Sequence, residues 1–301
     1  MTAEARLGVR LLRPGEPAYP DLLSETPDPP ALLYVRGSVP LEGEALAVVG
    51  SRRPTHYGRR MARELAGACA RAGIPVVSGL ARGIDSEAHR AALAAGGRTW
   101  AVLGSGLDNI YPPENKGLAE EIVAAGGALL SELPLSGPPL AMNFPRRNRI
   151  LSGLAWGTVV VEGDLKSGSL ITARAAAEQG REVFAVPGPA DSPMSEGPHE
   201  LLRQGARMAR RLEDILEELP MLRGQRPPQG VAARLPSAAC MYGPATIEQE
   251  KILKLLGSQS MTLEEMLQET GWDIPQLVRT LTVMEESGVL KPLPGQSYAR
   301  A

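Results

Sequence analysis

The sequence predicts an α/β protein with a Rossmann-like, doubly wound and mainly parallel sheet, followed by a small C-terminal winged-helix domain. Short continuous apolar runs typical of buried strands recur between residues 46 and 186, and helical patterns alternate with them. Such alternation indicates a parallel sheet covered on both faces, with right-handed crossovers. A proline-rich stretch then precedes a last segment that reads as three helices and a hairpin.

Composition limits the class of protein. The chain has 301 residues, of which 43% are apolar and 22% charged, and this fits a folded protein of two domains. The formal net charge of −2 does not decide whether the chain binds a polyanion, because clustering of charge matters more than the sum. Most of the 32 basic residues are arginine, which suits planar contacts with phosphate, although a GC-rich genome would give the same bias.

Cysteine usage and hydropathy predict the compartment. Cys69 and Cys240 form neither a metal-binding spacing nor a disulfide framework, as expected in a reducing cytosol. The first residues lack the apolar core of a signal peptide, and no run reaches the roughly 18 apolar residues of a membrane span. We therefore expect a cytoplasmic protein without membrane association, metal or cofactor.

The elements follow in order. Residues 1–45 are rich in proline and predict an irregular lead-in that packs on the main domain. The main domain is expected over residues 46–218. Its predicted strands cover 46–49, 74–77, 99–103, 128–130, 158–161 and 183–186, and its clearest helices cover 59–71, a stretch ending at Ala95, and 211–219.

The stretch from residue 142 to residue 154 contains a local contradiction. Asn143 is expected to cap a helix in which Pro145 takes the first position. The first turn should then favour acidic residues, yet it holds Arg146, Arg147 and Arg149 at an end that is already positive. This pattern predicts an anion site. The alternative is that these arginines pair with distant carboxylates such as those of Glu162 or Asp164.

Similar groups follow the predicted strands. Residues 50–53, 78–82, 104–106 and 166–169 combine glycine with hydroxyl or cationic side chains. In a doubly wound sheet such loops share the edge at which ligands bind. The residues expected to contact an anion are Ser51, Arg52, Arg53, Gly79, Arg82, Phe144, Arg146, Arg147, Asn148, Arg149, Lys166, Ser167, Gly168 and Ser169.

Two common nucleotide sites do not match. Residues 50–52 read Gly-Ser-Arg, not G-x-G-x-x-G, and no P-loop occurs around Lys166. Several separate phosphate cradles suit an extended polyanion better than one nucleotide. Single-stranded nucleic acid is the natural candidate, because it needs a phosphate track and an aromatic ring for base stacking. Phe144 could supply that ring, or it could be a core residue.

At these residues the chain resembles the bacterial DNA-processing protein A family, DprA, also called Smf. The matching pieces are Val49-Gly50-Ser51-Arg52, Ser78-Gly79-Leu80-Ala81-Arg82-Gly83-Ile84-Asp85 with Ala88-His89, Tyr111-Pro112-Pro113-Glu114-Asn115, Phe144-Pro145-Arg146-Arg147-Asn148-Arg149-Ile150, Ser167-Gly168-Ser169-Leu170-Ile171-Thr172-Ala173 and Phe184-Ala185-Val186-Pro187-Gly188. The resemblance implies a Rossmann-like protein that binds single-stranded DNA, usually as a dimer. It also implies loading of RecA recombinase onto incoming strands, past single-strand-binding protein, during natural transformation or recombination.

The chain also departs from the family pattern. Family members often carry a helical domain before the lead-in, and we expect this chain to lack one because it starts close to the lead-in. Glu162-Gly163-Asp164 stands where Val-Glu-Ala is usual, which places an extra carboxylate near the expected phosphate track. Gly197-Pro198-His199 replaces a common Gly-Ser-Asn. These departures weaken the transfer of roles to Asp164 and His199.

The alternative from another class is an enzyme. Related Rossmann-like nucleoside-monophosphate phosphoribohydrolases use a glycine-rich loop and a nearby glutamate, and Glu162 beside Gly168-Ser169 faintly resembles that layout. No convincing acid–base pair is visible, and His56, His89 and His199 lie in separate segments. We therefore expect a protein without catalytic residues.

The C-terminal part predicts a linker over 219–245 and a winged helix over 246–301. Helices are expected at 247–256, after a capping box at 262–265, and from Asp273 to Gly288, with strands at 289–293 and 297–298. Five basic and eight acidic side chains give residues 246–301 a charge of −3. Because a DNA reader needs the opposite balance, a protein contact is the better hypothesis for this domain.

Overall fold

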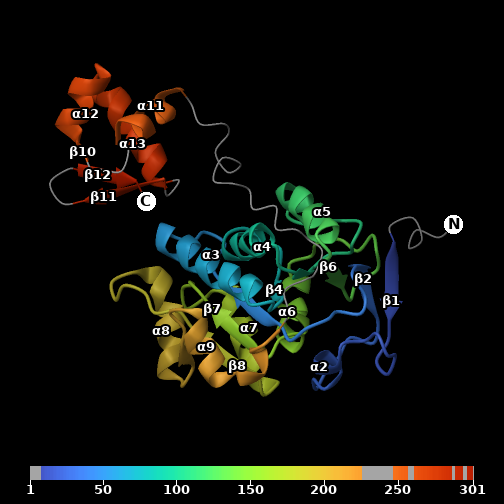
Figure 1. Cartoon of the computed structure of the whole chain (residues 1–301). Helices are drawn as coiled ribbons and strands as arrows, with labels where there is room; N and C mark the ends of the chain where they lie inside the picture. Colours follow the sequence, from blue (N-terminus) through green and yellow to red (C-terminus); the bar gives the residue numbers. More distant parts are fainter. Residues whose placement is uncertain (1–7, 226–246, 257–260, 287–288, 294–296, 301) are drawn as a thin grey trace. The chain divides into compact units, whose positions relative to one another are not determined.

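The computed structural model describes residues 8–225, 247–256, 261–286, 289–293 and 297–300. The chain divides into two compact units, Met1–Ala233 and Arg234–Ala301. Their elements are labelled in Figure 1. In the described residues, no helix has the length and apolar character needed to cross a membrane.

The first unit is built on a nine-stranded sheet with the order β1-β2-β6-β5-β4-β3-β7-β8-β9. The strands are β1 (Val9–Leu12), β2 (Leu33–Gly37), β3 (Leu46–Val49), β4 (Val76–Ser78), β5 (Thr99–Val102), β6 (Ala128–Ser131), β7 (Gly157–Val160), β8 (Glu182–Ala185) and β9 (Arg207–Met208). Strands β3 to β9 pair in parallel, whereas β1 and β2 add antiparallel pairs. The predicted doubly wound, mainly parallel sheet is confirmed.

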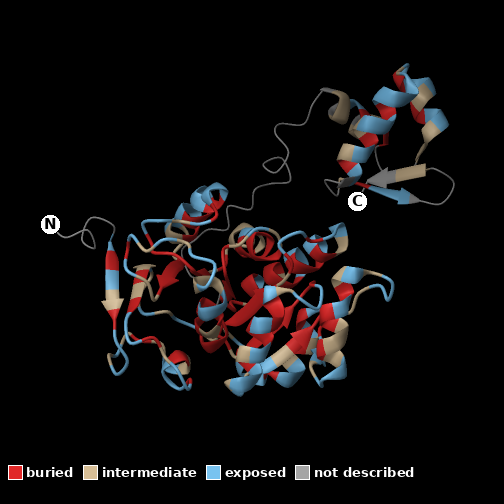
Figure 2. Ribbon diagram, turned by 180° about the vertical axis from the view of Figure 1, so that it is seen from behind, coloured by how far each residue is buried: buried red, intermediate tan, exposed pale blue. Residues whose placement is uncertain are grey.

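Helices cover both faces of this sheet. One layer contains α3 (His56–Arg71), α4 (Ile84–Ala94), α5 (Lys116–Ala124) and α9 (Leu212–Glu218), and the other contains α2 (Asp21–Ser24), α6 (Asn143–Gly153), α7 (Gly168–Glu178) and α8 (Glu196–Arg203). In β3, Leu46 and Val48 pack toward α3, while Ala47 and Val49 pack toward α6 and α7. Figure 2 shows the buried residues concentrated in the strands and on the inner faces of the helices. Three short 3₁₀ turns, Pro113–Asn115, Pro193–Ser195 and Pro220–Leu222, complete the unit.

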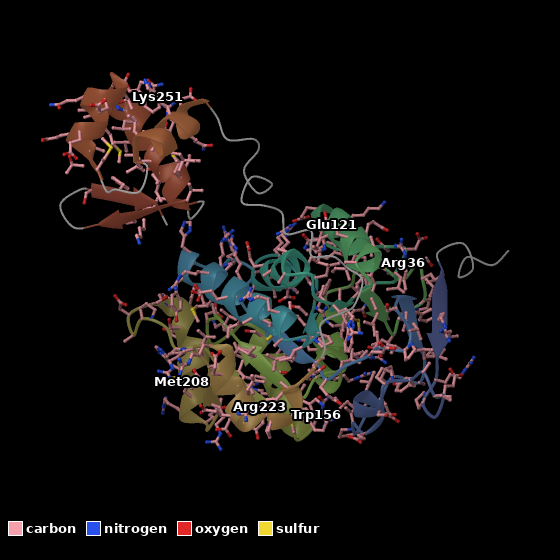
Figure 3. The ribbon with its side chains drawn as sticks, viewed as in Figure 1. Arg36, Glu121, Trp156, Met208, Arg223 and Lys251 are labelled. Carbon is pink, nitrogen blue, oxygen red and sulfur yellow. The ribbon has the colours of Figure 1, made fainter. Side chains whose placement is uncertain are left out.

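The described part of the lead-in contains more regular secondary structure than the sequence predicted. It supplies β1, α2 and β2, and β2 pairs antiparallel with β6. Leu33 and Val35 are fully buried at alternate positions, and the prolines flank the strand without interrupting it. Arg36 of β2 also donates to Glu120 of α5 over 2.6 Å, in the region that Figure 3 labels with Arg36 and Glu121. The high proline content of the lead-in therefore masked strands β1 and β2 in the prediction from sequence.

The expected linker begins later than residue 219. Leu219 and Leu222 are buried in the core beside α3 and α9. The Gln225 side chain donates to the Glu44 carbonyl over 2.7 Å and accepts its N–H over 3.0 Å. Residues 219–225 therefore pack on the first unit, and the rest of the expected linker lies outside the described residues.

Among its described residues, the second unit contains three helices and a three-stranded sheet. Its elements are α11 (Ile247–Leu256), β10 (Met261–Thr262), α12 (Leu263–Thr270), α13 (Ile274–Glu286), β11 (Leu290–Leu293) and β12 (Ser297–Arg300), and the sheet order is β10-β12-β11. Thr262 and Glu265 form the predicted capping box. Lys251, labelled in Figure 3, lies 5.4 Å from the Trp272 ring centroid and donates to the Thr270 carbonyl. Only the two-residue strand β10 was not predicted.

Candidate nucleic-acid interface

The site lies where the sheet reverses its winding. From β3 the chain builds outward to β6 on one side, and it then returns to add β7 on the other side of β3. Val49 lies opposite Val160, so the loops that leave β3 and β7 start side by side. Such a switch point is where doubly wound sheets bind ligands. A cavity of about 680 Å³ opens there.

The loop after β3 supplies exposed cations. The Ser51 N–H donates to the Glu162 carbonyl over 2.7 Å, and the Ser51 hydroxyl accepts the Arg53 N–H over 3.1 Å. These bonds fix the turn while Arg52 and Arg53 stay exposed and line the cavity. The Arg52 guanidinium lies 5.6 Å from the centroid of the Phe144 ring. The loop therefore presents fixed positive charge beside an aromatic surface.

The start of α7 forms a second wall of the cavity. Lys166, Ser167, Gly168 and Ser169 all line it. Ser167 caps the helix by accepting the Ser169 N–H over 3.3 Å, and the first turn contains no acidic residue. The positive end of the helix dipole therefore faces the cavity without a carboxylate to neutralise it. Within the described part of the chain, neither Arg52 nor Lys166 has a carboxylate within ion-pair distance.

Phe144 forms the aromatic wall. Its ring lies 5.6 Å from the Tyr111 ring at 56°, and both rings line the cavity. A Cβ on Gly104 would stand only 2.7 Å from the ring, so the glycine is needed for the ring to sit there. Phe144 is half-buried, so it packs in part against the protein and leaves part of its surface accessible at the cavity.

Residues 104–106, which were expected to form a phosphate cradle, are not accessible to a ligand. Ser105 is buried, and its carbonyl accepts a hydrogen bond from Ser131 over 2.7 Å. Gly106 donates to the Gly137 carbonyl over 2.9 Å, and Gly104 is covered by Phe144. This loop therefore positions the ring, and the other three predicted loops contribute lining residues.

The helix start at residue 143 differs from the prediction. Met142 precedes α6 with helical backbone angles and no side-chain cap, so Asn143 is already the first helical residue and Pro145 the third. The Asn143 side chain instead donates to the Pro138 carbonyl over 3.1 Å. Pro145 is still tolerated because the first N–H groups of a helix have no intrahelical partner.

The arginines of this helix are mostly structural. Arg147 is 5% exposed, and its Nη1 donates to the carbonyls of Gly79, over 2.8 Å, and of Val102. Burial lowers the pKa of Arg147 to about 10, and the neighbouring Asp85 opposes that shift. Arg147 does line the cavity, but its Nη1 is engaged by backbone carbonyls of the sheet edge.

Carboxylates hold the two other arginines. Arg149 pairs with Glu132 over 2.7 Å and with Asp28 over 2.9 Å. Arg146 is 64% exposed in its side chain and lies 3.4 Å from Glu132. The alternative of carboxylate pairing therefore holds for Arg146 and Arg149, with partners other than Glu162 and Asp164, whereas Arg147 bonds to backbone carbonyls.

A buried polar network supports the floor. Asp85 accepts the N–H groups of Gly79 and Ala81 over 3.1 and 3.3 Å, and burial raises its pKa while Arg147 opposes the shift. A Cβ on Gly79 would overlap both the Asp85 carboxylate and the Arg147 guanidinium. Gly79 is therefore required for packing and does not itself line the cavity.

His89 belongs to the same network. The Thr99 hydroxyl donates to the Val76 carbonyl over 2.6 Å, so it accepts from the His89 Nδ1–H over 2.7 Å. The unprotonated Nε2 then accepts the Leu80 N–H over 3.3 Å, which helps to hold Leu80 at a φ of 56°. Burial lowers the pKa of His89 to about 3, and the histidine is thus a neutral structural group.

The structure brings most, but not all, of the predicted residues together. Gly79, Arg82, Arg146 and Arg149 do not line the cavity, and Arg82 instead pairs with Glu114 on the surface. Lining residues that the prediction lacked are Val49, Gly50, Ala81, Asp85, Tyr111, Pro139, Ala141, Pro145, Leu151, Asp164, Ile171, Thr172 and Met194. Tyr111 lies in a motif already noted in the sequence, but its place at the cavity depends on the strand order.

Glu162 does not have the position of a catalytic group. It is 3% exposed, and its carboxylate accepts the N–H and the hydroxyl of Thr55, over 2.9 and 2.5 Å. Thr55 is the N-cap of α3, so Glu162 stabilises a helix start. In the described residues, no group of three or more His, Cys, Asp and Glu side chains could hold a metal ion.

Comparisons with known proteins give matches to one family. Residues 10–220 match the family described as DNA recombination-mediator protein A, and residues 238–296 match the DprA winged helix domain. The chain is 44% identical to Protein Smf of Escherichia coli over 94% of this chain and 75% of that protein. It is 45% identical to DNA processing protein DprA of Bacillus subtilis over 73% of this chain and 74% of that protein.

Solved structures are similar as well. The DNA processing protein A of Streptococcus pneumoniae has a TM-score of 0.66 and 40% identity, covering 72% of this chain and 78% of that one. That of Helicobacter pylori, described for its single-stranded DNA binding mode, has a TM-score of 0.64 and 31% identity, covering 72% of this chain and 97% of that one.

Proposed function

The chain belongs to the DNA recombination-mediator protein A family, and from this premise we propose that its cavity binds single-stranded DNA. The observation that carries the proposal is the meeting of three features in one cavity: the exposed cations Arg52 and Lys166, the start of α7, and the Phe144 ring. Phosphates pair with the cations and the helix end. A base stacks on the Phe144 ring. A duplex would have to unpair a base before that base could stack in the same way.

The contacts proposed for DNA are narrower than the sequence suggested. They comprise Ser51, Arg52, Arg53, Phe144, Asn148, Lys166, Ser167, Gly168 and Ser169, with exposed Arg146 as an outer contact. Arg147, Arg149 and Gly79 hold these groups in place, and Arg82 lies on the neighbouring surface. The single-stranded DNA binding described for the Helicobacter pylori relative supports the proposal.

The wider role follows from family membership. We propose that the protein processes DNA during natural transformation or recombination, in the cytoplasm, by protecting incoming single strands and loading RecA past single-strand-binding protein. A homodimer would be the working form. Catalysis by the phosphoribohydrolase route is disfavoured because the Glu162 carboxylate is committed to Thr55.

A salt titration of oligonucleotide binding tests the proposal. The logarithm of the affinity for single strands should fall with the logarithm of salt, by about 0.7 per phosphate contacted, and duplex should bind more weakly. Arg52→Ala should reduce affinity about tenfold and lower the slope by about one contact, with thermal stability unchanged. Arg174→Ala, at an exposed position on α7 that does not line the cavity, serves as the control. A flat salt dependence or a preference for duplex would contradict the proposal.

A further inference from the structure

One carboxylate lines a cavity that is otherwise built for anions. Asp164 lies between β7 and α7, is exposed, and shares the cavity wall with Lys166. Its Oδ1 accepts the Lys166 backbone N–H over 2.8 Å, which fixes the side chain in the turn. Among the described residues, no lysine or arginine side chain lies within ion-pair distance of this carboxylate. Its negative charge is therefore free to act on a ligand.

A phosphate would be repelled at this position. Like charges at close range disfavour binding, so Asp164 opposes the function of Arg52 and Lys166 if the backbone of the strand passes it. A carboxylate accepts hydrogen bonds only, and the donors that single-stranded DNA offers are on its bases. The group of the ligand that suits Asp164 is thus a base edge with an amino group.

The aromatic wall makes such a contact geometrically reasonable. Phe144 and Asp164 line the same cavity, so a base that stacks on the ring has its edge inside the space that the carboxylate also borders. Cytosine presents an exocyclic amino group to an acceptor. Thymine presents carbonyl oxygens on both sides of its single N–H, and these oxygens are repelled by a carboxylate.

We propose that Asp164 determines base preference in the cavity, favouring cytosine over thymine at the stacked position. The inference rests on the proposed binding of single-stranded DNA and adds a modest bias to contacts that phosphates dominate. One charge-assisted hydrogen bond at a solvent-accessible site gives a preference of about threefold to tenfold. Asp164→Asn should abolish it, because an amide offers a donor to thymine as well as an acceptor to cytosine.

Competition between oligo(dC) and oligo(dT) of equal length, at neutral pH, tests this inference in the full chain. The unmodified protein should prefer oligo(dC), and Asp164→Asn should bind both alike while keeping the acceptor for the Lys166 N–H. Glu178→Gln removes an exposed charge at the far end of α7 and should leave the preference intact. Equal affinities in the unmodified protein, or a gain of affinity shared by both oligonucleotides in Asp164→Asn, would overturn the inference, since the latter shows only phosphate repulsion. Failure to bind either oligonucleotide would instead overturn the proposed function, and this inference with it.

Discussion

Two sets of cationic side chains meet at the same edge of the sheet and differ in what surrounds them. Arg52 and Lys166 stand exposed on short loops, whereas Arg147 is buried beneath them against Asp85 and backbone carbonyls. An exposed cation can exchange water for phosphate at little cost to the fold. A buried one has already exchanged its water for protein oxygens, so its removal leaves those oxygens without partners. Position in the fold, more than residue type, separates ligand contacts from scaffold.

Arg147→Ala should have the largest effect on stability. Removing the buried guanidinium should cost about 3–5 kcal/mol, because two buried carbonyls lose their donor and the buried Asp85 loses the charge of a nearby cation. The helix-dipole argument alone would predict the opposite sign. Urea unfolding of Arg147→Ala beside Arg146→Ala, an exposed neighbour, measures the difference. If Arg147→Ala kept full stability and lost only DNA affinity, Arg147 would belong with the exposed cations.

The buried His89 should make the free energy of unfolding depend on pH. The folded pKa of His89, about 3, lies below the ordinary value of 6.5, so the unfolded chain takes up the proton first. The contribution of neutral His89 to the free energy of unfolding is complete above pH 6.5. It is lost as pH falls toward 3, at about 1.4 kcal/mol per pH unit. Unfolding free energies of the unmodified protein and His89→Gln across this range isolate the slope, since carboxylates contribute to both. Parallel curves would contradict a neutral, buried His89.

Removal of the second unit should have the smallest effect on binding. The charge of −3 over residues 246–301 and the exposed apolar residues Ile274 and Val278 on α13 do not suit contact with phosphate. A chain ending at residue 233, which retains the Gln225 bonds to Glu44, should bind single strands within about 1 kcal/mol of the full chain. A hundredfold loss with the first unit still folded would show that the pocket cations are insufficient by themselves.

The repeating pattern of the core could be read from the sequence because a buried parallel strand needs a continuous apolar run. The parallel strands from β3 to β8 were found within a few residues, as was the capping box at Thr262. Strands β1 and β2 were not predicted because prolines lie near them and because only antiparallel pairing, of β1 with β2 and of β2 with β6, fixes them. The local sequence pattern of a segment does not indicate which distant strand it pairs with.

The site was harder to predict for the same reason. Arg147 and Arg149 look equivalent to Arg146 along the chain, yet their partners Gly79, Val102, Glu132 and Asp28 come from other strands and loops. The glycine loop at 104–106 resembles a phosphate cradle until Phe144 is seen to cover it. A residue pattern can place a loop at the correct edge, but which side chain reaches the surface depends on distant packing.

The contact between Phe144 and Gly104 has a thermodynamic consequence for ligand capture. The Phe144 ring packs against Gly104, which has no side chain. The torsional freedom of the ring is therefore already lost when the protein folds. A base that stacks on it therefore does not have to immobilise it, and more of the stacking energy is retained as affinity. Residue 104 thus limits the space behind the Phe144 ring, and an alanine there would push the ring forward and narrow the opening for a base.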